Sequence, residues 1–219
     1  MDFSLFLHYG PSLASGLGVT LLCWAAGAVL GMVLGFAIAL LRRLPVPPLR
    51  WALRAIIEVV RGTPFLVQLY LLYDGGPAIG LRLADVPTGI LALGIYGSAY
   101  FAEIFRAGFD SVPQGQIEAA LSLGFSRGAI LWRIRVPTML VAIVPALTNM
   151  LIILSKEVVV LSVIAVPELM YQVQSMAAET FAAFETILAL ALLYWLMVEL
   201  VARLGRAAER RATAFLRAA

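Results

Sequence analysis

Residues 3–41 read FSLFLHYGPSLASGLGVTLLCWAAGAVLGMVLGFAIALL and contain no Asp, Glu, Lys or Arg. A helix of about 20 apolar residues crosses the hydrocarbon core of a membrane, so this stretch is long enough for one span. We predict that span over residues 13–41. Within it, Gly27, Gly31 and Gly35 recur at every fourth position, a spacing that lets a second helix approach closely.

The rest of the chain has the same apolar character. Of 219 residues, 62% are hydrophobic and 13% are charged, whereas soluble domains average about 45–50% apolar and about 25% charged residues. Uncharged or nearly uncharged runs predict further spans over residues 86–108, 137–155 and 181–202. The fold class we expect is all-α and integral to the membrane, with five transmembrane helices in a single domain.

The second span is the least regular of the five. Only residues 62–73 are free of charge, which is too short to cross a membrane alone. One arrangement is a single helix from residue 49 with its charged residues at the wet end. The other is an amphipathic surface segment over residues 49–60 followed by a span over residues 63–80. We favour the second, because Thr63 can cap a helix and Pro64 suits its first turn.

The basic residues indicate an orientation. With the N-terminus outside, fourteen of the sixteen Lys and Arg residues fall on the cytoplasmic side, as the positive-inside rule requires. These fourteen are Arg42, Arg43, Arg50, Arg54, Arg61, Arg106, Arg127, Arg133, Arg135, Arg203, Arg206, Arg210, Arg211 and Arg217. We therefore interpret the net charge of +3 as a signal of topology, and we expect lipid and no nucleic acid as a partner.

The chain lacks the residues of the common catalytic and metal sites. Its one lysine, Lys156, does not follow glycine, so the chain has no phosphate-binding loop of the Gly-Lys-Ser/Thr type. Its single histidine, His8, and single cysteine, Cys23, cannot build a zinc site of the usual ligand count. We expect no enzyme, no metal site and no cofactor bound by this chain.

The polar segment between the third and fourth spans reads SVPQGQIEAALSLGFSRGAILWRIRVP over residues 111–137. It predicts a short helix over residues 113–124, with Gly124 at its end. A short cytoplasmic helix joined to a span at each end can act as a lever that moves both spans. The spacing alone is equally compatible with a helix that only lies at the interface.

The order Glu118-Ala119-Ala120, then Gly124, then Pro137 resembles the EAA motif of ABC importer permeases. Three further stretches resemble the polar amino acid permeases of the histidine/glutamine type. They read EVVRGTPFLVQL at residues 58–69, AYFAEIFRAG at 99–108 and LSVIAVPELM at 161–170. The resemblance covers residues 12–210 without large gaps.

This resemblance implies a type I importer fold, in which the helix over residues 113–124 is the coupling helix. It also implies a cytoplasmic ABC ATPase subunit that binds ATP and Mg²⁺ and contacts this chain through Glu118, Ala119, Ala120 and Gly124. Five spans are too few for a whole pathway, so we expect a second permease subunit, identical or similar. A separate periplasmic or lipid-anchored binding protein would deliver a polar amino acid, which places the chain in a bacterial inner membrane.

Polar residues at membrane depth are candidates for the substrate path, because such residues are costly there and often functional. The candidates are Gln68, Ser98, Asn149, Lys156 and Glu157. Four of them have a structural alternative: Gln68 can join two helices, Lys156 can neutralise Glu157, and Ser98 belongs to a Gly94-Ser98-Ala102 stripe that favours helix packing. Family members often carry Lys-Asp-Thr-Ser-Leu where this chain has KEVVV at residues 156–160, so its substrate can differ.

Two other acidic residues are interpreted structurally. Glu103 and Arg106 lie three positions apart, and we predict a salt-bridged pair near the cytoplasmic face. Glu118 is expected to form ion pairs that hold its loop.

The rival function is a membrane scaffold or sensor that transports nothing, and association with an ATPase distinguishes it. An ion-coupled carrier acting alone would carry internal repeats, and we find none.

Overall fold

The computed structural model describes residues 4–217, with side chains described for residues 8–211. Arg217, one of the fourteen basic residues assigned to the cytoplasmic side, lies outside the range of described side chains. Every regular element in the described chain is helical. Four helical stretches there are long and apolar enough to cross a membrane, and a bent pair of helices can supply a fifth crossing. The four stretches are His8–Leu41, Asp85–Asp110, Arg127–Ile164 and Ala183–Arg211, which overlap the predicted spans at 13–41, 86–108, 137–155 and 181–202.

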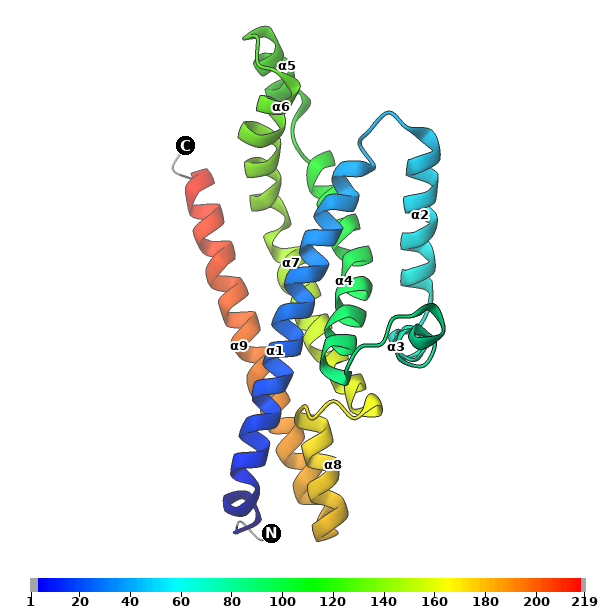
Figure 1. The fold of residues 1–219 in the computed structure, drawn as a ribbon. Helices are drawn as coiled ribbons and strands as arrows, with labels where there is room; N and C mark the ends of the chain where they lie inside the picture. Colours follow the sequence, from blue (N-terminus) through cyan, green and yellow to red (C-terminus); the bar gives the residue numbers. More distant parts are fainter. Residues whose placement is uncertain (1–3, 218–219) are drawn as a thin grey trace.

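The centre of the fold is the packing of α1 (Ser4–Leu41) on α4 (Asp85–Asp110), the most extensive contact between two elements. Figure 1 shows the two helices running alongside each other. Two stripes of small residues face one another there. A Cβ added at Gly31 would lie 3.2 Å from the Gly94 carbonyl oxygen, and one at Gly35 would lie 2.9 Å from the Ser98 carbonyl oxygen. Both small-residue stripes therefore serve close helix packing.

The prediction for the second span is wrong in two respects. The proposed helix over residues 63–80 does not form, because α3 covers nine residues, Phe65–Tyr73. Nine residues extend about 14 Å at 1.5 Å each, less than half of a hydrocarbon core of about 30 Å. The preceding helix, α2 (Pro47–Gly62), does not lie flat: it stands beside α4 (Figure 1), where its Ile57 is buried against Ala99 and Ala102. The chain bends by 106° at the break between α2 and α3.

The break itself lies at the expected Gly62-Thr63-Pro64. Proline disfavours the helical conformation of the residue before it, and Thr63 is extended, with φ −109° and ψ 141°. Thr63 was expected to cap α3, but its hydroxyl instead donates to the Val59 carbonyl oxygen at 3.0 Å, on the helix that ends there. A helix therefore ends at this break, as predicted, but Thr63 caps the end of α2 and not the start of α3.

The segment between α4 and α7 projects from the spans as a short helix and a turn (Figure 1). The helix, α5, covers Gln114–Ser122, close to the predicted 113–124. Next come α6 (Arg127–Ile130), a π-helical turn η2 (Leu131–Arg135) and α7 (Val136–Glu157), which join into one long stretch. The Ser126 hydroxyl caps α6 by accepting the Ala129 N–H at 3.2 Å.

After α7 the chain continues through a 3₁₀ segment, η3 (Val158–Ile164), to α8 (Leu169–Thr180), which lies further from α5 than α7 does (Figure 1). It then returns along α9 (Ala183–Arg217), so the chain reverses after α8 and not directly after α7. The first described residues of α1 and the last of α9 lie at opposite ends of the molecule, and α5 lies towards the end reached by α9 (Figure 1). The main core joins α4, α7 and η3 through fully buried Phe101, Leu154 and Leu161.

Candidate functional site

A groove with a volume of about 490 Å³ lies between α4 and α7, and we call it the α4–α7 groove. Most of its surface is apolar, with a few polar side chains at intervals. One wall is α4, with Tyr100, Glu103 and Ala107; the other is α7, with Asn149 and Ile153. Mainly apolar walls with sparse polar groups are typical of small-molecule sites.

The end of α2 supplies a third side of the groove. Arg61 places its guanidinium 5.3 Å from the centre of the Tyr100 ring, within the range of a cation–π contact. Asn149 is exposed in the groove and makes no hydrogen bond to other described residues. Its amide can therefore bind a ligand or a second protein chain.

A polar stripe on α4 continues beyond the groove. The hydroxyls of Tyr96 and Tyr100 are 3.5 Å apart, and Glu157 lies close enough to Tyr96 to interact electrostatically. Together with Glu103, the two tyrosines occupy one helix face, since residues three and four apart are neighbours. Neither tyrosine was predicted as a site residue, although both lie at helical spacing from Glu103 in the sequence.

The predicted path residues do not gather in one place. Asn149 lines the groove, and Glu157 lies at the end of the α4 stripe, half-buried and with no ion pair to any described residue. Lys156 is exposed and is not paired with Glu157 either, so the suggested neutralising pair does not form within the described chain. Ser98 is buried towards α1, where its hydroxyl donates to the Ile95 carbonyl oxygen at 2.7 Å.

Gln68 has a structural function at the break between α2 and α3. Its amide nitrogen donates to the Val60 carbonyl oxygen at 2.7 Å, and lies 3.0 Å from the Thr63 carbonyl oxygen and 2.9 Å from the Thr63 hydroxyl oxygen. The last carbonyls of a helix lack partners within that helix, so this side chain supplies them. Gln68 therefore stabilises the bend between α2 and α3.

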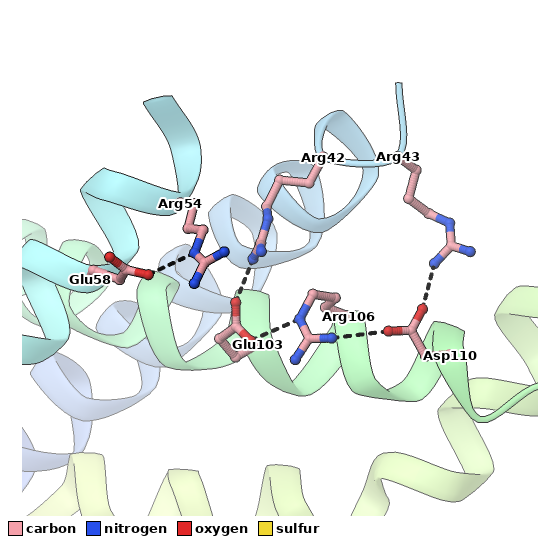
Figure 2. A network of polar contacts seen from close by, with 7 residues as sticks. All are labelled: Arg42, Arg43, Arg54, Glu58, Glu103, Arg106 and Asp110. Carbon is pink, nitrogen blue, oxygen red and sulfur yellow. Dashed lines mark hydrogen bonds and ion pairs between the residues drawn. The ribbon is translucent and has the colours of Figure 1, made fainter. Parts of the chain in front are cut away.

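Glu103 and Arg106 form the predicted pair, with Arg106 Nε 2.8 Å from Glu103 Oε2. The pair belongs to a wider network, shown in Figure 2. Arg42, just beyond the end of α1, also binds Glu103, and Arg106 bridges on to Asp110 at 3.0 Å. The network ties α1 to α4 where the groove approaches the arginine-rich end, and Arg42 is the member that the sequence spacing did not predict.

The coupling-helix candidate, α5, presents two different faces. Ile117 and Ala120 are buried, whereas Glu118 and Ala119 are exposed. The expected ion pairs of Glu118 are absent from the described chain, because its carboxylate lies on the exposed face and no described cation is within reach. This exposed carboxylate is therefore available to a partner protein.

Gly124 ends α5 in a Schellman motif. The Gly124 N–H donates to the Leu121 carbonyl oxygen at 2.9 Å, and the Phe125 N–H donates to the Ala120 carbonyl oxygen at 3.0 Å. The motif needs a left-handed residue, and Gly124 has φ +79°. Because glycine has no Cβ, it adopts this conformation at little cost, so Gly124 sets the angle at which α5 leaves the spans.

A second polar cluster surrounds Glu168, which is fully buried at the start of α8. Its carboxylate accepts the N–H groups of Met170 at 2.9 Å and Tyr171 at 3.0 Å. The hydroxyls of Thr20 in α1 and Tyr194 in α9 lie 3.5 Å and 3.3 Å away. Despite these donors, burial raises the pKa of Glu168 from 4.5 to about 7. The helix-capping position after Pro167 was a usable signal that the sequence analysis passed over.

Within the described residues, no group of three or more His, Cys, Asp or Glu side chains is placed to hold a metal ion.

Comparison with known proteins gives a consistent result. The family model "Binding-protein-dependent transport system inner membrane component" matches residues 27–214. The arginine transport system permease protein of Bacillus subtilis (strain 168) is 31% identical over 212 residues, which are 96% of this chain and 97% of that protein. A probable glutamine ABC transporter permease protein of the same strain is 35% identical over 194 residues, covering 89% of this chain and 90% of that protein.

Solved structures share the fold. A chain of an amino acid ABC transporter crystallised with histidines superposes with a TM-score of 0.88 at 36% identity, covering 96% of this chain and 99% of that one. A chain of an inward-facing methionine ABC transporter superposes with a TM-score of 0.78 at 20% identity, which shows the fold alone, covering 93% and 97%. With a family model over most of its length and relatives matched almost end to end, this chain belongs to the inner membrane components of binding-protein-dependent transport systems, the permease subunits of ABC importers.

Proposed function

We propose that this chain forms one half of the transmembrane path of an ATP-driven importer for polar amino acids. One observation carries the mechanism: α4 and α7 form the two main walls of the α4–α7 groove, and α5 lies in the segment that joins them. A force applied to α5 therefore reaches both walls. This connection favours transport over a scaffold, which needs no coupling between a groove and an external helix.

The force would come from a separate ATPase subunit. This chain has no Gly-Lys-Ser/Thr sequence, so ATP and Mg²⁺ would be bound and ATP hydrolysed on the partner. That subunit would grip the exposed face of α5 through Glu118 and Ala119, while Ile117 and Ala120 anchor the helix. ATP binding would then bias the permease between inward- and outward-facing states, because the ligand has a different affinity for each.

A second permease subunit, either a copy of this chain or a similar one, would close the path. The α4–α7 groove is an open surface feature, and Asn149 and Ile153 within it are exposed in the single chain. Pairing two such grooves would enclose a pathway lined by Tyr100 and Asn149.

The substrate class follows from the relatives and from one residue. The relatives named above are described as arginine, glutamine and amino acid transporters. Glu157 has no cationic partner in the described chain and is half-buried. We therefore propose an amino acid or related compound with a cationic group, delivered by a separate binding protein. Lys156 and Asn149 are the other proposed path residues, whereas the contacts of Gln68 and Ser98 favour structural functions.

The proposed orientation puts the N-terminus outside and the C-terminus in the bacterial cytoplasm. It rests on the fourteen basic residues counted above and on α5 lying at the arginine-rich end. An ATPase that works in the cytoplasm can reach α5 only in this orientation.

The test of transport is ATPase activity in liposomes that contain the chain, its neighbouring ATPase and its binding protein, with single amino acids added in turn. We expect stimulation by one or a few amino acids, and loss of stimulation in Glu118→Ala. Gln174→Ala, on an exposed part of α8 far from α5, should retain it. If the folded chain forms no complex with an ATPase, the scaffold becomes the better interpretation.

The test of the substrate class uses Glu157→Gln in the same liposomes. Stimulation by cationic amino acids should weaken more than stimulation by neutral ones, because the variant keeps the shape and loses the charge. Glu185→Gln, on another helix outside the groove, is the control. Unchanged selectivity in Glu157→Gln would remove Glu157 from the proposed path.

A further inference from the structure

A second cavity, of about 870 Å³, lies at the end of the molecule that carries α5. Its lining is strongly basic, and it shares no lining residue with the α4–α7 groove. We call it the arginine cavity. Its seven arginines are Arg42, Arg43, Arg50, Arg54, Arg106, Arg127 and Arg135. Trp51, Ile117, Leu121 and Leu131 contribute apolar surface to the same cavity.

The carboxylates around the cavity are too few to neutralise it. Glu103 binds Arg42 and Arg106, Asp110 binds Arg106 and lies 3.4 Å from Arg43, and Glu58 binds Arg54 (Figure 2). Seven arginines against three carboxylates leave an excess of four positive charges. Three of the arginines have no ion pair to any described residue, and these are Arg50, Arg127 and Arg135.

Arg135 is the member of this group whose environment is incomplete. Its Nε atom is buried and has no hydrogen-bond acceptor among the described residues. The positive charge of Arg43 repels the Arg135 guanidinium, whereas the negative charge of Asp110 attracts it. A buried donor without an acceptor is costly, and more so on a charged group. Arg135 also lines the cavity and has no ion pair to a described residue, so an anion bound in the cavity would offset its charge.

The position of the cavity indicates where this anion comes from. Arg42 and Arg43 directly follow α1, and Arg135 directly precedes α7, so these guanidinium groups lie where membrane spans meet water. Trp51, also in the lining, is 72% exposed, and tryptophan is enriched at that level of the membrane. Lipid headgroups occupy this level.

We propose that the arginine cavity binds the phosphate headgroup of an anionic phospholipid. Arginine binds phosphate through paired hydrogen bonds, and basic pockets between transmembrane helices on the cytoplasmic side bind such headgroups. The apolar side chains of Ile117 and Leu121 lie beside the arginines, which suits a ligand with a charged head and apolar chains. Since both residues belong to α5, the lipid contacts the element through which the ATPase is proposed to act.

A protein partner with acidic residues is the competing occupant, and the geometry favours lipid over it. The cavity contacts α5 through Ile117 and Leu121, whereas Glu118 and Ala119 on the exposed surface of α5 are not in its lining. A partner that grips Glu118 would therefore contact a different part of α5. The lipid proposal needs only the membrane position of the spans and does not depend on the identity of the substrate.

The test measures lipid retention by native mass spectrometry on the purified importer complex, after exchange into equal amounts of phosphatidylglycerol, cardiolipin and phosphatidylethanolamine. We expect the wild type to retain the two anionic lipids in preference to the zwitterionic one. Arg135→Gln should reduce the ratio of anionic to zwitterionic lipid retained by about tenfold, which is the effect of losing one charged hydrogen-bonded contact. Arg133→Gln is the matched control, since Arg133 is exposed in the same η2 turn and lies outside the cavity lining.

Arg50→Gln is a second variant in case Arg135→Gln does not fold, because Arg50 is exposed and unpaired among the described residues. It should also reduce the preference. Equal retention in the wild type and in a folded cavity variant would overturn the proposal. So would stabilisation of lipid-free protein by inorganic phosphate without any lipid preference, which would make the cavity a site for free phosphate. Loss of ATPase association in the variants with unchanged lipid retention would assign the arginines to the protein partner instead.

Discussion

A Cβ atom added at Gly35 of α1 would lie 2.9 Å from the backbone nitrogen of Ala102 in α4. The nearest atom is the Phe101 Cβ at 2.7 Å, and none of the three nearest atoms is the far end of a flexible side chain that could move aside. The two helices therefore approach each other at a distance that only glycine permits at this position.

Gly35→Ala should lower the free energy of unfolding of the protein by about 1–3 kcal/mol, which is the usual cost of overfilling a well-packed contact. The measurement is thermal unfolding in detergent. Gly18→Ala is the matched control on the same helix, because an added Cβ there meets nothing within 4 Å. Equal stability of the two variants would contradict the close packing of α1 on α4.

Gln68→Leu should destabilise the bend between α2 and α3. The variant removes the donor to the half-buried carbonyls of Val60 and Thr63, and the loss of such a hydrogen bond costs about 0.5–1.5 kcal/mol. Gln68→Glu should have a similar effect, since a carboxylate cannot donate. Thermal unfolding and proteolysis at the Gly62-Thr63-Pro64 break are the measurements. A variant with normal stability and altered transport would instead return Gln68 to the substrate path.

Gly124→Ala should weaken the end of α5. A non-glycine residue in the left-handed region costs about 1–2 kcal/mol, and Gly124 has φ +79° with open space around it, so the cost is one of backbone conformation alone. Hydrogen exchange of the α5 amides should become faster. Gly115→Ala in the same helix has open space and an ordinary φ, so its exchange should be unchanged or slower. Faster exchange in both variants would point to a general loss of stability.

The stability of the wild type should depend on pH through Glu168. Burial raises the pKa of Glu168 to about 7 in the folded protein, from 4.5. A raised pKa means that the folded state prefers the protonated carboxyl. Its contribution is therefore fully present below pH 4.5 and is lost as the pH rises through about 7. The expected loss between these values is on the order of 2 kcal/mol.

Thermal unfolding of the wild type and Glu168→Gln from pH 5 to pH 8 tests this dependence, over about the range in which the carboxyl would titrate. The stability difference between the two proteins should change in favour of the variant as the pH rises. Glu118→Gln, at an exposed carboxylate, should follow the wild type throughout. A constant difference between the wild type and Glu168→Gln would mean that Glu168 keeps one charge state over this range.

The candidate site was predictable to different degrees in its different parts. Glu103 with Arg106, and the short helix ending at Gly124, depend on residues close together in the sequence, where spacing determines the contact. Arg42 with Glu103 depends on how α1 lies against α4, and no local pattern encodes it. The position of Glu168 after Pro167 indicated a helix cap, but its burial could not be predicted, since it requires α1 and α9 to meet at the start of α8.

The sequence by itself determined that the chain is a membrane protein with four regular spans and a projecting α5, because long uncharged runs and helix stop signals act over a few turns of one segment. It also marked the break at Gly62-Thr63-Pro64. Only the tertiary structure decided that α2 stands beside α4, that Gln68 closes the break, and that Tyr100 and Asn149 line one groove. These features depend on the relative placement of helices, which is set by the packing of surfaces that lie far apart in the sequence.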